Sequence, residues 1–245
     1  MKVGKYYRNR EEHCISGGTG CGVVYLSGCD MHCAYCLVYD ISQEGKGVPY
    51  TPRQLAELLC SLQQRGVSHI SLANVEPSSD EVIEAVAIAR ELGLTVPLLN
   101  NFNGYAPTAF TRRLQPFFQG YIMDFKYADT ALGAHLSAAP DYPRRALANL
   151  ALLSAHYGNN RYDAAGLLQS GVLLRHLILP GMWRNTEDAL RLIAANNPCG
   201  YPLSLLPDFV PEGRTAAVLR PPYAVSPQRL HQLTELAHSL GLELI

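Results

Sequence analysis

The sequence predicts an α/β protein whose six strand–helix units form an incomplete, twisted (β/α)6 barrel that is open on one side. Short apolar runs alternate with amphipathic stretches along the chain, a pattern typical of βα units around a parallel sheet. The chain has 245 residues and 48% hydrophobic side chains, enough for one large core. No Gly/Ser-rich linker interrupts it. We therefore expect a single domain over 1–245, with a core of about 20–206 and a C-terminal loop and helix, 207–245, capping the barrel.

Each predicted strand is a short apolar run bounded by polar residues, glycine or proline. Parallel strands that are covered on both faces are expected to have this composition. Pro97 is unusual within the third run, because proline cannot donate a hydrogen bond to a central ladder. The six runs, in chain order, are 22–26, 69–73, 95–99, 121–125, 172–178 and 203–206.

The predicted helices lie between these strands. Thr51 is expected to cap the first helix, with Pro52 at its first position. The second helix opens with a capping-box pattern at 78–81 and ends before Gly93. The remaining helical stretches are 108–118, which is interrupted, 144–156, 185–195 and 226–241.

Composition and charge limit the classes of partner. The net charge of −1 provides no general field for nucleic acid or an anionic membrane. The first residues lack the apolar stretch of a signal peptide, and no apolar run approaches the roughly 20 residues that cross a bilayer. Seven cysteines in such a chain favour metal ligation in a reducing compartment over a disulfide framework. We therefore expect a cytoplasmic protein that binds neither nucleic acid nor membrane.

Three closely spaced cysteines, Cys29, Cys33 and Cys36, are the clearest candidates for metal ligands. A closed structural zinc site needs four ligands, whereas this loop offers three thiols with no obvious fourth. A [4Fe–4S] cluster held by three thiolates would keep an open coordination position on one iron. A zinc loop or ordinary reduced thiols are the alternatives. The roles of Cys14 and Cys21 stay open.

Polar residues that follow the predicted strands give an independent indication of a site. The segment 74–77 follows the second strand, 100–105 follows the third, and 124–126 closes the fourth. In parallel α/β barrels the carboxyl ends of the strands meet at one rim, and ligands bind there. The cysteine loop follows the first strand, so we expect these groups to lie together.

The cysteine motif resembles that of the radical S-adenosylmethionine (radical SAM) superfamily, in which an aromatic residue, here Tyr35, precedes the last cysteine. The resemblance extends to the activating enzymes of glycyl-radical proteins, and more closely to proteins related to pyruvate formate-lyase activating enzyme. It implies a TIM-like barrel of the radical SAM type. The matching fragments are 27–29, 39–43, 103–105, 124–129, 141–143 and 175–181.

The resemblance implies two cofactors. The three cysteines would bind one [4Fe–4S] cluster, and S-adenosylmethionine would bind at its open iron. Glu76 occupies the end of the superfamily's Gly-Gly-Glu-Pro segment, which meets the amino group of S-adenosylmethionine. Asn74 and Val75 stand in place of the two glycines, which weakens the implied backbone contact.

Further residues follow from the same resemblance. Asp124 and Lys126 match an Asp-x-Lys pair near the methionine carboxylate, and an ammonium beside a carboxylate is a strong charge-assisted contact. A strand-end ion pair at the surface is the alternative for this pair. Asn101 falls where relatives often carry an aspartate that helps to hold a monovalent cation. Asn101 and Phe102 replace the acidic and hydroxyl residues of that cation site.

Three residues are candidates for contact with the rest of the cofactor. His176 matches a family histidine at the end of the fifth strand, and its alternative is a core histidine whose ring is satisfied by the protein. Tyr35 and Leu177 are candidates for contact with adenine, because a flat base needs apolar surfaces on its faces.

The sequence therefore predicts an enzyme that reductively cleaves S-adenosylmethionine to a 5′-deoxyadenosyl radical, which abstracts a hydrogen atom from a substrate. A glycyl-radical enzyme or a peptide is the candidate substrate, and a small molecule is the alternative. Reduced flavodoxin or ferredoxin is the implied electron donor. An iron–sulfur module for electron transfer or cluster binding, without this chemistry, is the alternative of another class. Arg214, Arg220 and Tyr223 are candidates for substrate contact.

Overall fold

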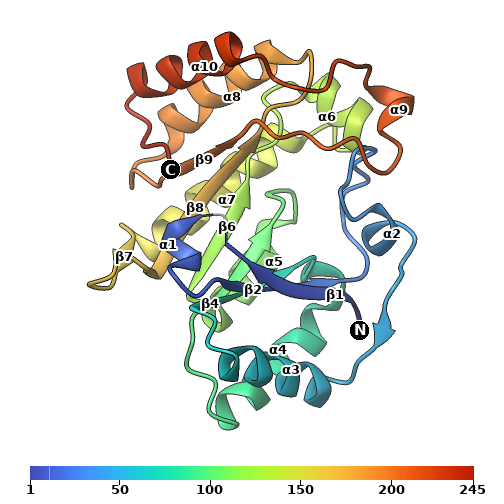
Figure 1. Cartoon of the computed structure of the whole chain (residues 1–245), viewed down its shortest axis with the longest axis vertical. Coiled ribbons are helices and arrows are strands. Elements are labelled where there is room, and N and C mark those ends of the chain that lie inside the picture. Colours follow the sequence, from blue (N-terminus) through green and yellow to red (C-terminus); the bar gives the residue numbers. More distant parts are fainter. Residues whose placement is uncertain (11) are drawn as a thin grey trace.

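The computed structural model describes residues 1–10 and 12–245, and its main element is a nine-stranded sheet (Figure 1). The strands are β1 (Lys2–Asn9), β2 (Cys21–Leu26), β3 (Val48–Pro49), β4 (His69–Ala73), β5 (Leu98–Phe102), β6 (Gly120–Asp124), β7 (Arg161–Tyr162), β8 (Leu168–Leu177) and β9 (Leu203–Leu206). The helices are α1 (His13–Ser16), α2 (Tyr39–Ser42), α3 (Pro52–Gln64), α4 (Ser79–Glu91), α5 (Thr108–Leu114), α6 (Thr130–Ser137), α7 (Tyr142–Tyr157), α8 (Trp183–Asn196), α9 (Thr215–Val218) and α10 (Pro227–Ser239).

The strands β2, β4, β5, β6, β8 and β9 are neighbours in that order, and each pair is parallel. These strands are the six that the sequence predicts. The strand β1 adds to the free edge of β2 in the antiparallel sense, and β3 pairs with β1. Within the described residues β1 and β9 do not pair, so the sheet is not closed. The predicted incomplete barrel is therefore confirmed.

The sheet buries apolar side chains on both faces. On one face, Leu72, Tyr121 and Leu174 belong to the large core beneath the helices. On the other, Leu99, Ile122, Leu168 and Leu173 form a smaller cluster with Ile15 of α1. Because side chains alternate along a strand, the residues between the large-core positions point to the inner face of the open barrel.

The first predicted helix cap is confirmed and the second is wrong. The side chain of Thr51 accepts a hydrogen bond from Gln54 N, and Gln54 returns one to Thr51 N, which makes a complete capping box at the start of α3. Ser78 makes no such bond, because the chain enters α4 through a 3-10 turn over Glu76–Ser78. The capping pattern is therefore replaced by a turn that carries Glu76.

The third strand lies further along the chain than predicted. It spans Leu98–Phe102, whereas the sequence predicted 95–99. Pro97 cannot donate to the sheet, and the amides of Thr95 and Val96 donate instead to the side chain of Gln63, at 2.7 and 3.0 Å. Asn101 therefore belongs to the strand rather than to the loop after it.

The edge strand β1 and the short helix α6 are among the elements that were not predicted. Asp129 caps α6 by accepting hydrogen bonds from the amides of Ala131 and Leu132, at 2.6 and 3.1 Å. The helices α8 and α10 pack together at one end of the molecule, opposite α3 and α4 (Figure 1). Among the described residues there is no helix long and apolar enough to cross a membrane.

Candidate functional site

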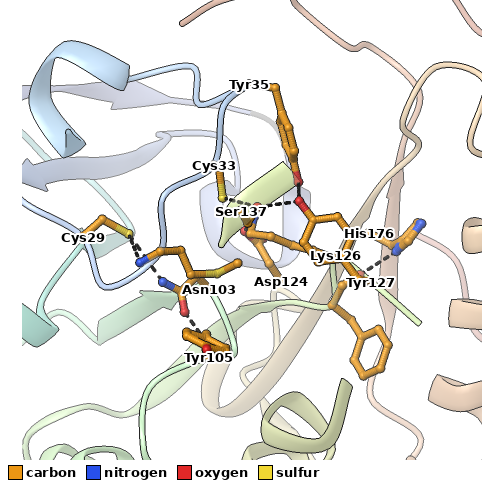
Figure 2. A network of polar contacts seen from close by, with 12 residues as sticks. Cys29, Cys33, Tyr35, Asn103, Tyr105, Asp124, Lys126, Tyr127, Ser137 and His176 are labelled. Atoms are coloured by element: carbon orange, nitrogen blue, oxygen red, sulfur yellow. Dashed lines mark hydrogen bonds and ion pairs between the residues drawn. The ribbon is translucent and has the colours of Figure 1, made fainter. Parts of the chain in front are cut away.

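The three cysteines lie in the loop after β2, and the sulfur of each accepts a hydrogen bond. Figure 2 shows Cys29 and Cys33 with their donors. Asn103 Nδ2 lies 3.5 Å from Cys29 Sγ, and the amide of Met31 donates to the same sulfur at 3.5 Å. Ser137 donates to Cys33 Sγ at 3.0 Å. Ser42 donates to Cys36 Sγ at 3.2 Å. Donors aimed at sulfur stabilise negative charge there, as a metal-bound thiolate requires.

The conformation of this loop is held by the end of α6. The amides of His32 and Ala34 donate to the carbonyls of Ser137 and Leu136, at 3.1 and 2.9 Å. Gly28 has a φ of 94°, in the left-handed region that favours glycine. These contacts and this φ define the shape of the loop, and α6 is the element that supports it.

The cysteine set fits a cluster that is held by three thiolates. Burial raises the pKa of the Cys33 and Cys29 thiols, so iron must displace a proton from each sulfur when it binds. Within residues 1–10 and 12–245 no three or more His, Cys, Asp or Glu side chains are grouped so as to hold a single metal ion. The three sulfurs with their donors are nevertheless suited to ligate the irons of a cluster.

Glu76 has a buried carboxyl group with an unpaired oxygen. Its side chain lies in the turn after β4, the residue is 9% exposed, and Oε1 has no hydrogen-bond partner. Burial, and then the charge of Asp30, raise the pKa of Glu76 to about 8. Asp30 accepts from Asn103 at 2.5 Å through one oxygen, while its other oxygen is also buried and unpaired. A cation between the two carboxylates would satisfy both.

Asn74 preserves the backbone shape that the sequence comparison put in question. Its φ is 60°, in the left-handed region where asparagine is the best tolerated residue after glycine. The side chain donates to the carbonyl of Leu26 at 3.0 Å, which ties the ends of β4 and β2 together. Replacement of the first glycine therefore does not by itself abolish the turn that leads to Glu76.

Asp124 and Lys126 form a partly buried ion pair at the end of β6. Lys126 Nζ lies 2.5 Å from Asp124 Oδ2. The side chain of Lys126 is 17% exposed and that of Asp124 is 28% exposed. Burial alone would lower the pKa of Lys126, but the charges of Asp124 and Cys33 outweigh it and hold that pKa well above its ordinary value. Lys126 is therefore a permanent cation beside the cysteine loop (Figure 2).

Tyr142 positions the ion pair. Its hydroxyl lies 2.8 Å from the carbonyls of Asn103 and Asp124, and it accepts a hydrogen bond from the amide of Lys126 at 2.9 Å. Gly104 allows this approach, since a Cβ there would lie 2.8 Å from the carbonyl oxygen of Asp124. The ends of β5 and β6 are thus joined through one buried hydroxyl.

Asn101, Asp124 and Leu177 share the inner face of the sheet. Asp124 pairs with Arg175 of β8, so their side chains point to the same side of the sheet. Leu177 lies two residues after Arg175 on β8 and therefore points to that side as well. Asn101 pairs with Ile122, two residues before Asp124, and points there as well. The structure therefore brings these three predicted residues to one face. Their contacts with a cofactor stay predictions.

His176 points to the opposite face. It is fully buried, its Nδ1 donates to the carbonyl of Phe125 at 2.6 Å, and its Nε2 accepts from the hydroxyl of Thr186 on α8 at 3.1 Å. Burial lowers its pKa to about 4, so the ring is neutral. Both nitrogens are satisfied by the protein, which is the geometry of a core histidine. A cofactor contact by His176 stays a prediction that this geometry does not favour.

Tyr35 is buried in the cysteine loop, and its hydroxyl lies 2.6 Å from that of Tyr127. Its ring centroid lies 6.1 Å from that of Phe209, in the segment after β9. The amide of Arg214 in the same segment donates to the carbonyl of Ala34 at 2.6 Å. The C-terminal segment therefore packs against the cysteine loop.

The sequence alone predicts no role for the donors around the sulfurs. Ser42, Asn103 and Tyr127 lie inside fragments of the family resemblance, but Ser137 lies in a helix that was not predicted. Asp129 followed by a small residue is an N-cap signal that could have located this helix. Its contact with Cys33 joins residues 104 apart in the chain, which no local pattern reveals.

Comparisons with known proteins agree with this site. Residues 16–120, which include the three cysteines, match the family described as 4Fe-4S single cluster domain. An uncharacterized protein of Methanocaldococcus jannaschii is 20% identical over 230 residues. That match covers 91% of this chain and 63% of the relative, so the chain spans less than two thirds of its length.

Solved structures show the same fold at low sequence identity. SuiB of Streptococcus suis bound to S-adenosylmethionine matches with a TM-score of 0.63 and 11% identity over 91% of this chain and 49% of that one. HydG of Carboxydothermus hydrogenoformans matches with a TM-score of 0.61 and 11% identity, over 91% of this chain and 52% of HydG. QueE of Escherichia coli matches with a TM-score of 0.50 and 11% identity, over 99% of this chain and 92% of QueE.

The chain shares the fold of SuiB, HydG and QueE, and at this sequence identity the likeness shows the fold alone. The barrel that the resemblance implies is therefore confirmed as a fold, and the cluster-domain match supports the [4Fe–4S] cluster that the cysteine spacing predicts. The likeness to an activating enzyme of glycyl-radical proteins stays a prediction.

Proposed function

We propose that the chain is a radical SAM enzyme in which Cys29, Cys33 and Cys36 hold one [4Fe–4S] cluster. The observation that carries the proposal is a loop of three cysteines whose sulfurs each accept a hydrogen bond, beside a buried ion pair and an unpaired carboxylate. When bound, the cluster and S-adenosylmethionine supply one-electron reduction and a 5′-deoxyadenosyl radical that abstracts a hydrogen atom.

The residues around the loop have the charges that the two ends of a methionine group need. Glu76 offers its unpaired oxygen to the amino group and would lose its proton when that cation binds, with Asp30 beside it. Lys126 offers its ammonium to the carboxylate, and Asp124 holds that ammonium in place. The amino acid end of S-adenosylmethionine would thus lie between the turn after β4 and the end of β6.

Tyr35, Leu177 and Asn101 are proposed to surround the rest of the cofactor. Leu177 and Asn101 lie on the inner face of the sheet, at the same rim as Asp124. Tyr35 and Phe209 provide apolar ring surfaces between the cysteine loop and the C-terminal segment. This enclosure is expected to exclude water from the reacting atoms.

We propose a protein loop or a peptide as the substrate class, with a small molecule as the second candidate. The sheet is open between β1 and β9, which supports entry of an extended segment. Reduced flavodoxin or ferredoxin is the proposed electron donor. The substrate is tested by adding candidate peptides that are deuterated at carbon and following the label into 5′-deoxyadenosine by mass.

The central experiment is anaerobic reconstitution with iron and sulfide, followed by dithionite and S-adenosylmethionine. We expect 5′-deoxyadenosine from the native chain and none from Cys33→Ala, because the variant lacks one ligand of the cluster. Cys60→Ala is the matched control, since Cys60 is a half-buried thiol on α3 and not in the loop. A loaded, reducible cluster that neither binds nor cleaves S-adenosylmethionine would instead identify an electron carrier.

A further inference from the structure

Three buried hydroxyls form an unbroken chain that ends on a cysteine of the proposed cluster (Figure 2). The hydroxyl of Tyr35 lies 2.6 Å from that of Tyr127, which lies 2.6 Å from Ser137 Oγ. Ser137 Oγ lies 3.0 Å from Cys33 Sγ. Tyr127 and Ser137 are at most 1% exposed, and Tyr35 is 5% exposed. Water therefore has little access to this chain of hydroxyls.

The number of protons fixes the direction of the chain once Cys33 is bound to iron. A metal-bound thiolate has no proton, so Ser137 must donate to Cys33. Each hydroxyl carries one proton, so Tyr127 must then donate to Ser137, and Tyr35 must donate to Tyr127. All three O–H dipoles point toward the sulfur in this state.

An aligned chain stabilises negative charge at its end more than a single donor does, because each bond polarises the next. Reduction adds one electron to a cluster and increases the negative charge on its sulfurs. Donors to sulfur therefore favour the reduced state, and the effect is larger where water is excluded.

We propose that the Tyr35–Tyr127–Ser137 chain sets the reduction potential of the cluster through Cys33. The three residues are positioning residues, since they act through a ligand and not on the substrate. The inference rests on the cluster of the proposed function but not on cleavage of S-adenosylmethionine.

The chain also joins three separate parts of the fold. Tyr35 belongs to the cysteine loop, Tyr127 follows β6, and Ser137 ends α6. Tyr35 in turn contacts Phe209 of the C-terminal segment, with ring centroids 6.1 Å apart. A displacement of that segment would therefore move the hydroxyl of Tyr35, and we expect the reduction potential of the cluster to change with it.

The test is a potentiometric titration of the reconstituted full chain, followed by electron paramagnetic resonance of the reduced cluster and performed without S-adenosylmethionine. Iron content and visible absorption first establish that each variant is loaded. For Ser137→Ala we expect the ratio of reduced to oxidised cluster at a fixed potential to fall about tenfold, which is about 59 mV for a one-electron couple. Tyr127→Phe leaves Ser137 in place, so we expect the same ratio to fall only about threefold.

Ser154→Ala is the matched control, because Ser154 is a buried hydroxyl on α7 that makes no side-chain hydrogen bond. Its potential should equal that of the native chain. Ser137→Thr keeps a hydroxyl and should restore the native value, which a role in packing alone would not predict.

Native potentials in both Ser137→Ala and Tyr127→Phe would overturn the inference and leave the proposed function intact. Should Ser137→Ala fail to fold or load, Tyr127→Phe with an unchanged potential is sufficient to overturn it. A native chain that takes up no cluster contradicts the proposed function itself, which separates the two failures.

Discussion

At the scale of single residues, the unpaired oxygen of Glu76 makes stability depend on pH. The pKa of Glu76 is about 8 in the folded chain, against 4.5 for an unperturbed glutamate. The folded state therefore holds the proton more tightly than the unfolded state does. This stabilisation is complete below pH 4.5 and is lost as the pH rises through about 8.

We predict that the ligand-free chain loses about 2 kcal/mol of unfolding free energy between pH 5 and pH 7 through this group, and that Glu76→Gln removes the loss. The same variant should bind S-adenosylmethionine at least about tenfold more weakly, because a neutral amide replaces the carboxylate. Urea unfolding at both pH values, and a binding titration, measure the two effects. Glu57→Gln, an exposed carboxylate on α3, is the control. Identical pH slopes in native and Glu76→Gln chains would contradict the prediction.

The residues Asn74 and His176 show what a sequence comparison can and cannot decide. Asn74 could have been recognised as a substitute for glycine, because asparagine tolerates a left-handed backbone and its φ is 60°. His176 could not be assigned, because its face on β8 depends on the register of the strand. Both ring nitrogens are satisfied only by groups distant in the chain, Phe125 and Thr186.

At the scale of elements, α3 and α4 begin in different ways although both sequences suggest a cap. Thr51 and Gln54 form a reciprocal capping box, whereas Ser78 makes no side-chain cap bond. We predict that Thr51→Ala lowers the free energy of unfolding by about 1 kcal/mol and that Ser78→Ala changes it by less than about 0.5 kcal/mol. Denaturant midpoints of the two variants test this, and equal losses would show that the difference in capping has no energetic consequence.

The bounds of the strands were predictable where the apolar run was uninterrupted. His69–Ala73 and Leu203–Leu206 form with the bounds read from the sequence. The third strand shifted because the amides before Pro97 bind a side chain from α3 instead of the sheet. The edge strand Lys2–Asn9 was missed because its polar composition suits a sheet edge and carries no apolar run.

At the scale of the whole molecule, a buried ion pair joins the start of the chain to a distant strand. Glu12, just before α1, binds Arg175 of β8 through two contacts of 2.6 and 2.7 Å. Their side chains are 4% and 14% exposed. The geometry is bidentate and both charges are largely removed from water, which makes this a strong charge-assisted contact.

We predict that Glu12→Gln lowers the free energy of unfolding by about 3 kcal/mol, since it leaves the buried guanidinium beside a neutral amide. Asp188→Asn removes an exposed partner of Arg184 and should cost less than about 1 kcal/mol. Urea unfolding compares them. A loss in Glu12→Gln as small as that in Asp188→Asn would show that the ion pair does not hold the two parts together.

The site as a whole was predictable to the extent that it depends on loop position. Six parallel strands place their carboxyl ends at one rim, so the cysteine loop, Glu76 and Asp124 were expected to meet there. The hydroxyl chain behind Cys33 was not predictable, because it depends on packing between α6 and the residues after β6.

The small cluster of Ile15, Leu99, Ile122, Leu168 and Leu173 on the inner face shares no residue with the cysteine loop or the ion pair. This small cluster is thus separate from the residues of the proposed site. A descendant of this protein could exchange the loops at the rim, and with them its substrate, while keeping this small cluster of the inner face. Mutations in the small cluster should lower the yield and shorten the half-life of the protein, whereas mutations at the rim should alter its turnover.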